Sequence, residues 1–123
     1  MIWKIPSEGV TALAARGSKY HAKKTVVDGI EFDSAKEARR YTKLRAMEEN
    51  NEIHGLLLQV PFELLPSFDL EGVKYSGVRY IADFVYYRDG KRVVEDCKGF
   101  KTPEYKLKKK LMAYINHVNI EES

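Results

Sequence analysis

The chain of 123 residues has almost no cysteine, since Cys97 is the only one. One cysteine cannot form an internal disulfide, and it cannot supply the set of thiolates that holds a structural zinc ion. A lone cysteine is most simply expected to be a small residue that points into the core. The sequence therefore excludes a disulfide scaffold and a zinc-thiolate protein.

Long apolar runs are missing too. No segment approaches the roughly 18 apolar residues of a membrane span, and none resembles a secretion signal. The sequence contains no internal repeat. We therefore expect a cytoplasmic protein without membrane contact. It should form a single domain over residues 19–123, preceded by an irregular arm over residues 1–18.

Positive charge is small in sum, +3 at pH 7, but it is unevenly spread. Uneven charge is a better sign of a polyanion partner than net charge. Two clusters, "SKYHAKK" and "KGFKTPEYKLKKK", contain Lys19, Lys23, Lys24, Lys101, Lys106 and Lys109. A lysine run is also typical of a solvated helix face, so the second cluster fits either interpretation.

The first half of the chain predicts a hairpin, a helix and a strand. Asp28-Gly29 is typical of a two-residue hairpin turn. A helix should follow, with Asp33 or Ser34 as its N-cap and its end at Asn50-Asn51. The segment "IHGLLLQVPFELL" predicts a buried strand that Pro61 can break.

The second half predicts more strands around one helix. Residues 66–77 fit either a loop or a small hairpin, whereas Asp89-Gly90 strongly predicts a hairpin. Thr102 should cap a helix whose inner face contains Leu107, Leu111 and Tyr114, and "HVNIE" should form an edge strand. The order of elements predicts an α/β fold with a central mixed sheet flanked by helices.

The hairpin at Asp89-Gly90 should bring acids together. Counting back along both strands places Asp83 opposite Asp96, and strand alternation puts Lys98 on the same face. Two acids directly opposite one another repel. A proton, a bridge from Lys98 or a divalent cation can relieve the repulsion, and Mg²⁺ suits such a site. In a hairpin exposed to solvent the repulsion would matter little, but the apolar neighbours argue against that.

Glu37 has two interpretations. It can complete the capping box Ser34-x-x-Glu37, or it can point from the sheet-facing side of the helix toward the same ion, directly or through water. The two roles are partly compatible.

These residues, an acid on the first helix followed by "IADF", a short turn and "VEDCKG", resemble the PD-(D/E)XK nuclease superfamily. The longer blocks "DGIEFDSAKEARRY", "LQVPFELLP" and "VVEDCKGFKTPEYKLKKKLM" resemble more closely a family of small phage and prophage proteins regarded as endonucleases of that superfamily. The resemblance implies a restriction-endonuclease-like core related to Holliday-junction resolvases. It also implies action in the cytoplasm of a bacterial host.

By position, the resemblance makes Asp83 and Asp96 the two motif acids, Lys98 the motif lysine and Glu37 the helix glutamate. It also implies that the Cys97 carbonyl is a metal ligand. The sequence departs from the motif in two places. Ala82 stands where proline is usual, and Asp96 stands where glutamate is more frequent. Glu95 lies beside Asp96, and a bulge would exchange the two acids.

The expected function is a magnesium-dependent DNA endonuclease of phage recombination or replication, with Mn²⁺ as a substitute ion and selectivity for branched DNA allowed. Lys98 would act on the attacking water or stabilise the transition state, the latter being the safer assignment. Gln59 would contact the water or the backbone, or simply be a buried, hydrogen-bonded glutamine.

DNA phosphates are expected on the lysines named above and on Arg40. The alternative function is a basic nucleic-acid-binding module that cuts no bond. A resolvase would require a homodimer, for which an edge strand or the N-terminal arm is the candidate contact.

Overall fold

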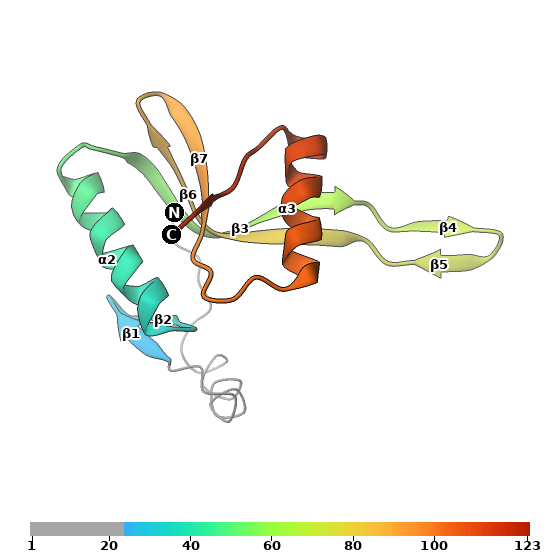
Figure 1. Cartoon of the computed structure of the whole chain (residues 1–123), viewed down its shortest axis with the longest axis horizontal. Coiled ribbons are helices and arrows are strands. Elements are labelled where there is room, and N and C mark those ends of the chain that lie inside the picture. Colours follow the sequence, from blue (N-terminus) through green and yellow to red (C-terminus); the bar gives the residue numbers. More distant parts are fainter. Residues whose placement is uncertain (1–23) are drawn as a thin grey trace.

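The structure is a computed structural model that describes residues 24–123. The predicted arm over residues 1–18, and the lysines Lys19 and Lys23, lie outside the described residues. The elements are β1 (Thr25–Val27), β2 (Ile30–Phe32), α2 (Ala35–Glu49), β3 (His54–Leu65), β4 (Phe68–Leu70), β5 (Val73–Tyr75), β6 (Val78–Arg88), β7 (Lys91–Asp96), α3 (Pro103–Asn116) and β8 (Glu121–Glu122) (Figure 1). Within this part of the chain, neither helix is long and apolar enough to cross a membrane.

The centre of the fold is a four-stranded sheet in the order β3-β6-β7-β8. Its first two pairings are antiparallel and the β7-β8 pairing is parallel, so the sheet is mixed. Figure 1 shows α2 and α3 on different sides of this sheet. Phe84 belongs to the core cluster with α2, and the next residue, Val85, belongs to the cluster with α3. The predicted α/β fold with a mixed sheet flanked by helices is confirmed, and it is consistent with a restriction-endonuclease-like fold.

The N-terminal hairpin and first helix form as the sequence predicts. Asp28 and Gly29 both have positive φ, which the predicted two-residue turn requires. Ser34 is the N-cap of α2, and its Oγ accepts a hydrogen bond from the Glu37 backbone N–H at 3.1 Å. The helix ends at Asn50, the predicted place.

Strand β3 forms as predicted, and of the two alternatives at Pro61 the structure shows the unbroken strand. The strand runs for 12 residues, and Pro61 pairs with Ile81 of β6. Because β3 is an edge strand, only one of its sides needs ladder hydrogen bonds, so a proline can be accommodated. The irregular residue is instead Gln59, whose φ is +54°.

Residues 66–77 form a small hairpin rather than a loop. Strands β4 and β5 meet at Glu71-Gly72, and Figure 1 shows that this hairpin extends away from the central sheet. The rings of Phe68 and Tyr75 stack across it with centroids 4.9 Å apart.

Helix α3 starts as predicted but presents a different inner face. The Thr102 Oγ accepts from the Tyr105 N–H at 3.1 Å, and Pro103 opens the helix. The buried residues are Tyr105 and Met112, whereas Leu107 is 54% exposed and Tyr114 is 81% exposed. Residues seven apart share a helix face, so the prediction chose the wrong stripe for these two, although Leu111 is partly buried.

The last strand lies slightly later than predicted. The sequence placed it within residues 117–121, and β8 comprises Glu121–Glu122. It pairs in parallel with the end of β7, and the Ser123 N–H donates to the Asp96 carbonyl at 3.0 Å. The chain therefore returns across α3 to hold the end of the strand that carries the candidate site.

Candidate functional site

The tight turn at Asp89-Gly90 sets the register of the site. Both residues have positive φ, at 54° and 75°, as a two-residue hairpin turn requires. Arg88 pairs with Lys91, and Phe84 pairs with Glu95. Continuing this register by one residue puts Asp83 opposite Asp96, as the sequence predicts.

Asp83 is the centre of a group of three acids. Burial, and then the negative charges of Glu37 and Asp96, together raise the pKa of its carboxyl group to about 8, while a hydrogen bond from the Cys97 N–H acts in the opposite direction. That N–H lies 2.9 Å from Asp83 Oδ2. In the metal-free protein at neutral pH, a proton on Asp83 therefore relieves much of the repulsion.

Gln59 connects two of the acids. Its Nε2 donates to Glu37 Oε2 and to Asp83 Oδ1, both at 3.3 Å. Leu58 pairs with Phe84 and Val60 with Ala82, which places Gln59 opposite Asp83 in the sheet. The hydrogen-bonded interpretation of Gln59 is thus the one that the geometry shows, and the glutamine fixes the separation of two carboxyl groups.

Asp96 is almost completely buried, at 2% exposure. Its Oδ2 accepts a hydrogen bond from the Tyr80 hydroxyl, and burial together with this bond raises the pKa of Tyr80. Its Oδ1 lies 3.4 Å from the Lys98 ammonium but has no hydrogen-bond partner within residues 24–123. A buried carboxylate oxygen without a hydrogen bond is costly unless something binds it.

Lys98 is half-buried beside this oxygen. Its ammonium lies 4.6 Å from the centroid of the Tyr105 ring, and its backbone carbonyl accepts from the Lys36 ammonium at 3.0 Å. The aromatic ring and Asp96 both attract the ammonium group and hold it at this place. Tyr80 and Lys36 were not identified from the sequence, because a strand tyrosine and a helix lysine are ordinary residues with no motif around them.

Glu95 and Asp96 do not exchange roles, because no bulge shifts them. Glu95 is 1% exposed, and its carboxylate accepts from Arg40 Nε at 2.5 Å, from a second Arg40 nitrogen at 2.9 Å and from the Tyr86 hydroxyl at 2.6 Å. Burial alone would raise its pKa, but the hydrogen bonds from Arg40 and Tyr86 lower the pKa below its usual value. Glu95 is therefore already bound by Arg40 and Tyr86, and Asp96 is the acid that lies opposite Asp83.

The donor set fits a magnesium ion in part. Among residues 24–123, no group of three or more His, Cys, Asp and Glu side chains stands ready to hold a metal ion. Magnesium needs only one or two carboxylates, however, because it keeps several of its waters. Asp83 and Asp96 supply two, and Asp96 Oδ1, which has the Lys98 ammonium at 3.4 Å but no hydrogen bond, is a candidate oxygen ligand. Glu37 contacts this pair through Gln59, which is compatible with a role through water.

Cys97 is half-buried rather than fully inside, and burial raises the pKa of its thiol. A raised thiol pKa leaves little thiolate at neutral pH, so the residue has no nucleophilic character. Its contribution to the site comes from the backbone, through the N–H on Asp83.

A profile of the family described as "Protein of unknown function (DUF1064)" matches residues 17–121. The chain belongs to this family. No curated protein matches it. Among solved structures, the crystal structure of protein VC1899 from Vibrio cholerae is similar to this DUF1064 chain, with 13% identity and a TM-score of 0.36. The match covers 98% of this chain and 42% of that one, and a likeness this low carries no argument about activity.

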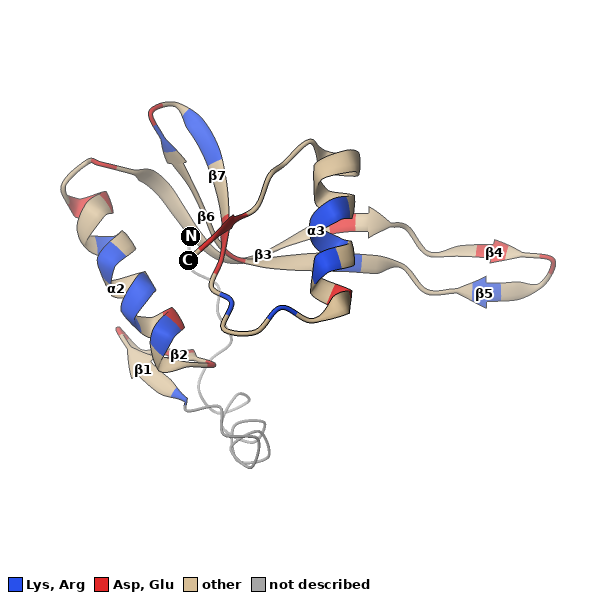
Figure 2. Cartoon of the chain, in the orientation of Figure 1, with Lys and Arg blue, Asp and Glu red and all other residues tan. Residues whose placement is uncertain are grey.

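The basic residues of this DUF1064 chain differ in their partners. Figure 2 shows basic segments on both α2 and α3. Lys101 and Lys109 both pair with Glu122, at 2.9 and 3.0 Å, and Lys24 pairs with Asp33 at 2.9 Å. Arg40 is held by Glu95, so it has little capacity left for a phosphate. Lys106 is exposed, and no acid of the described chain pairs with it.

Proposed function

We propose that this DUF1064 protein is a magnesium-dependent DNA endonuclease of the PD-(D/E)XK type. The observation that carries the proposal is the meeting of Asp83 and Asp96 across the hairpin, with a raised Asp83 pKa, an unpartnered Asp96 oxygen and Lys98 beside it. Perturbed carboxyl groups next to a lysine are typical of catalytic sites. The sequence resemblance to that superfamily supports the same assignment.

Asp83 and Asp96 would hold the ion, and the Cys97 carbonyl is the further ligand that the resemblance implies. When bound, magnesium lowers the pKa of a coordinated water and neutralises charge on the phosphate. Mn²⁺, with similar ligand preferences, should substitute. Tyr80 fixes the orientation of Asp96, and Gln59 fixes Asp83 relative to Glu37.

Lys98 is assigned to the developing negative charge on the phosphate. Its position between Asp96 and the Tyr105 ring places the ammonium beside the proposed metal ligands, which suits an electrostatic role. Glu37 would act on the water through the same hydrogen-bond network. No thiol or hydroxyl attack is needed, so the reaction is a direct hydrolysis.

The proposed substrate is DNA in the cytoplasm of a bacterial host, with the gene carried by a phage or prophage. Lys106 and the neighbouring lysines of α3 would bind phosphates non-specifically. The proposal includes selectivity for branched DNA and a homodimer, because a Holliday-junction resolvase needs two active sites and a homodimer supplies them.

The direct test is incubation of supercoiled plasmid with the purified protein and Mg²⁺. Nicking that stops in EDTA, returns with Mn²⁺ and disappears in Asp83→Asn is the expected result. The matched control is Asp69→Asn, which makes the same change in the exposed hairpin β4-β5, and it should cut normally.

A second function is supported by the proton on Asp83. Because that proton lets the two acids coexist without an ion, the site can be stable in a DNA-binding module that cuts nothing. In that case the plasmid stays intact with either metal, while DNA binding remains and weakens with salt.

A further inference from the structure

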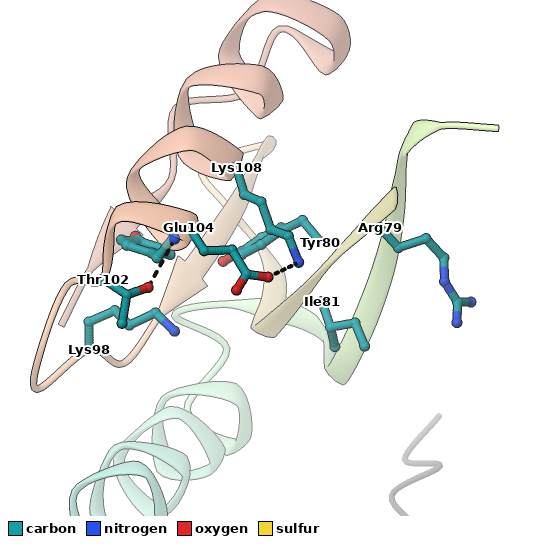
Figure 3. Close-up of a pocket in the computed structure, with 8 residues that line it drawn as sticks. Arg79, Tyr80, Ile81, Lys98, Thr102, Glu104 and Lys108 are labelled. Carbon is teal, nitrogen blue, oxygen red and sulfur yellow. Dashed lines mark hydrogen bonds and ion pairs between the residues drawn. The ribbon is translucent and has the colours of Figure 1, made fainter. Parts of the chain in front are cut away.

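A pocket of about 330 Å³ opens beside the candidate site (Figure 3). Tyr80 and Lys98, which both contact Asp96, also line this pocket, so the pocket adjoins the site. The volume is at the lower end of the range for small-ligand pockets, which suits one nucleotide and excludes a duplex.

Three of the residues that line the pocket are apolar or aromatic, and the other five are polar or charged. Ile81 lines it and is 49% exposed, although it lies on the central strand β6 two residues before Asp83. Tyr80 and Tyr105 line it as well. An exposed aliphatic residue beside buried aromatic residues gives a planar, apolar ligand a surface to lie on.

The charges at the pocket are mostly paired. The Lys108 ammonium lies 3.1 Å from Glu104 Oε2, and Lys98 lies beside Asp96. Figure 3 shows the Arg79 guanidinium extending away from the Glu104–Lys108 pair. The lining carries three cations and one acid, and because Lys108 pairs with Glu104 and Lys98 with Asp96, these pairs offer hydrogen-bond donors and an acceptor to the polar edge of a nucleobase.

We propose that this pocket holds one unpaired base of the DNA strand that is cut, next to the scissile phosphate. The inference rests on the proposed endonuclease function, and it names the substrate class as DNA with an unpaired nucleotide rather than continuous duplex. Enzymes that take a base out of the stack hold it between apolar and aromatic side chains and read its polar edge. Ile81 and Tyr80 supply the first of these, and the Glu104–Lys108 pair supplies the second.

Binding measured without catalysis tests the pocket. Fluorescence anisotropy in EDTA would compare three labelled DNAs: a single strand, its duplex, and the duplex with one unpaired central nucleotide. The wild type should bind the first and third about tenfold more tightly than the plain duplex, because contact with a base adds affinity that the backbone does not supply.

Ile81→Ala and Ile81→Glu test the wall of the pocket. Ile81→Ala should reduce the preference for unpaired DNA about fivefold and Ile81→Glu should abolish it, while duplex binding changes less than twofold. Val73→Ala, an equally aliphatic change at a residue 51% exposed in the distant hairpin, should leave the preference intact. Thermal unfolding monitored by circular dichroism confirms that each variant is folded.

Equal affinity for all three DNAs would overturn the inference, and so would a preference that both Ile81 variants retain or that Val73→Ala also loses. These outcomes are independent of the plasmid assay. A protein that nicks plasmid without a preference for unpaired DNA keeps the proposed function and loses the pocket. A protein that shows the Ile81-dependent preference but cuts nothing keeps the base site and loses the nuclease.

Discussion

Two neighbouring acids at the end of β7 are equally buried and have opposite surroundings. Glu95 points to one side of the sheet, where Arg40 and Tyr86 satisfy both of its oxygens and lower its pKa. Asp96 points to the other, where it meets a second acid and keeps one oxygen without a hydrogen bond. Burial alone therefore does not indicate a functional carboxylate. A buried carboxylate is a candidate functional group when, as in Asp96, one of its oxygens lacks a hydrogen bond and a second acid lies beside it.

The largest expected effect is the loss of nicking activity when Asp96 is substituted. Asp96→Asn should reduce plasmid nicking by at least about a thousandfold, since it removes a metal ligand that contributes several kcal/mol to transition-state stabilisation. Its free energy of unfolding should change little, because the remaining repulsion with Asp83 and the attraction to Lys98 are lost together. Nicking rates and urea unfolding would be compared with those of Asp69→Asn. Activity within tenfold of wild type would rule out the site.

A substitution of Glu95, whose oxygens are both hydrogen-bonded, should instead lower the stability and leave the activity nearly unchanged. Glu95→Gln leaves the mostly buried Arg40 without its counter-charge, and breaking such a pair should lower the free energy of unfolding by about 3 kcal/mol. Well below the unfolding midpoint, the variant should still nick plasmid within a few-fold of wild type. Equal losses of activity in Glu95→Gln and Asp96→Asn would mean that the two faces of β7 are not distinct.

Asp83 and Glu95 should also affect the stability of the fold in different pH ranges. The Asp83 pKa is raised to about 8, so the folded, metal-free protein holds a proton that the unfolded chain has released. Stability in EDTA should therefore fall as pH rises from 5.5 to 7.5, by about 2 kcal/mol at most. Asp83→Asn should remove this slope. The lowered pKa of Glu95 stabilises the fold at these pH values, and its contribution is lost only in more acidic solution. A wild-type slope that Asp83→Asn retains would contradict the assignment.

The smallest expected effects distinguish paired from unpaired lysines. Lys106→Gln removes a cation without an acidic partner in the described chain, so it should weaken DNA binding and reduce the slope of log affinity against log salt by about 1. Lys109→Gln removes a cation already paired with Glu122, so its effect should be smaller. Anisotropy titrations at several salt concentrations measure both slopes. A larger change for Lys109→Gln would show that Glu122 releases the lysine to DNA.

The sequence was sufficient where one local rule decides the structure. The Asp89-Gly90 turn has a fixed loop length, so it set the register and brought Asp83 and Asp96 together. Thr102 was correctly identified as an N-cap, and Ser34 is the N-cap among the two candidates Asp33 and Ser34, because capping depends on the next three residues alone.

The parts that local patterns could not decide depend on distant pairing. Gln59 reaches Asp83 only because β3 lies against β6 with an irregular residue in the middle, and no local pattern predicts that register. The face of α3 depends on the sheet surface that the helix covers. The pairing of Lys101 and Lys109 follows from Glu122, which becomes their neighbour only when β8 joins β7.

The position of β8 also affects when the protein can become active. The strand that holds the end of β7 comes more than twenty residues later in the sequence, and the Ser123 N–H reaches back to the Asp96 carbonyl. During synthesis the acids emerge from the ribosome before the segment that fixes them, and domains fold as their parts become available. The candidate site would therefore be complete only after β8 has joined β7, which makes this pairing a late step in the assembly of the site.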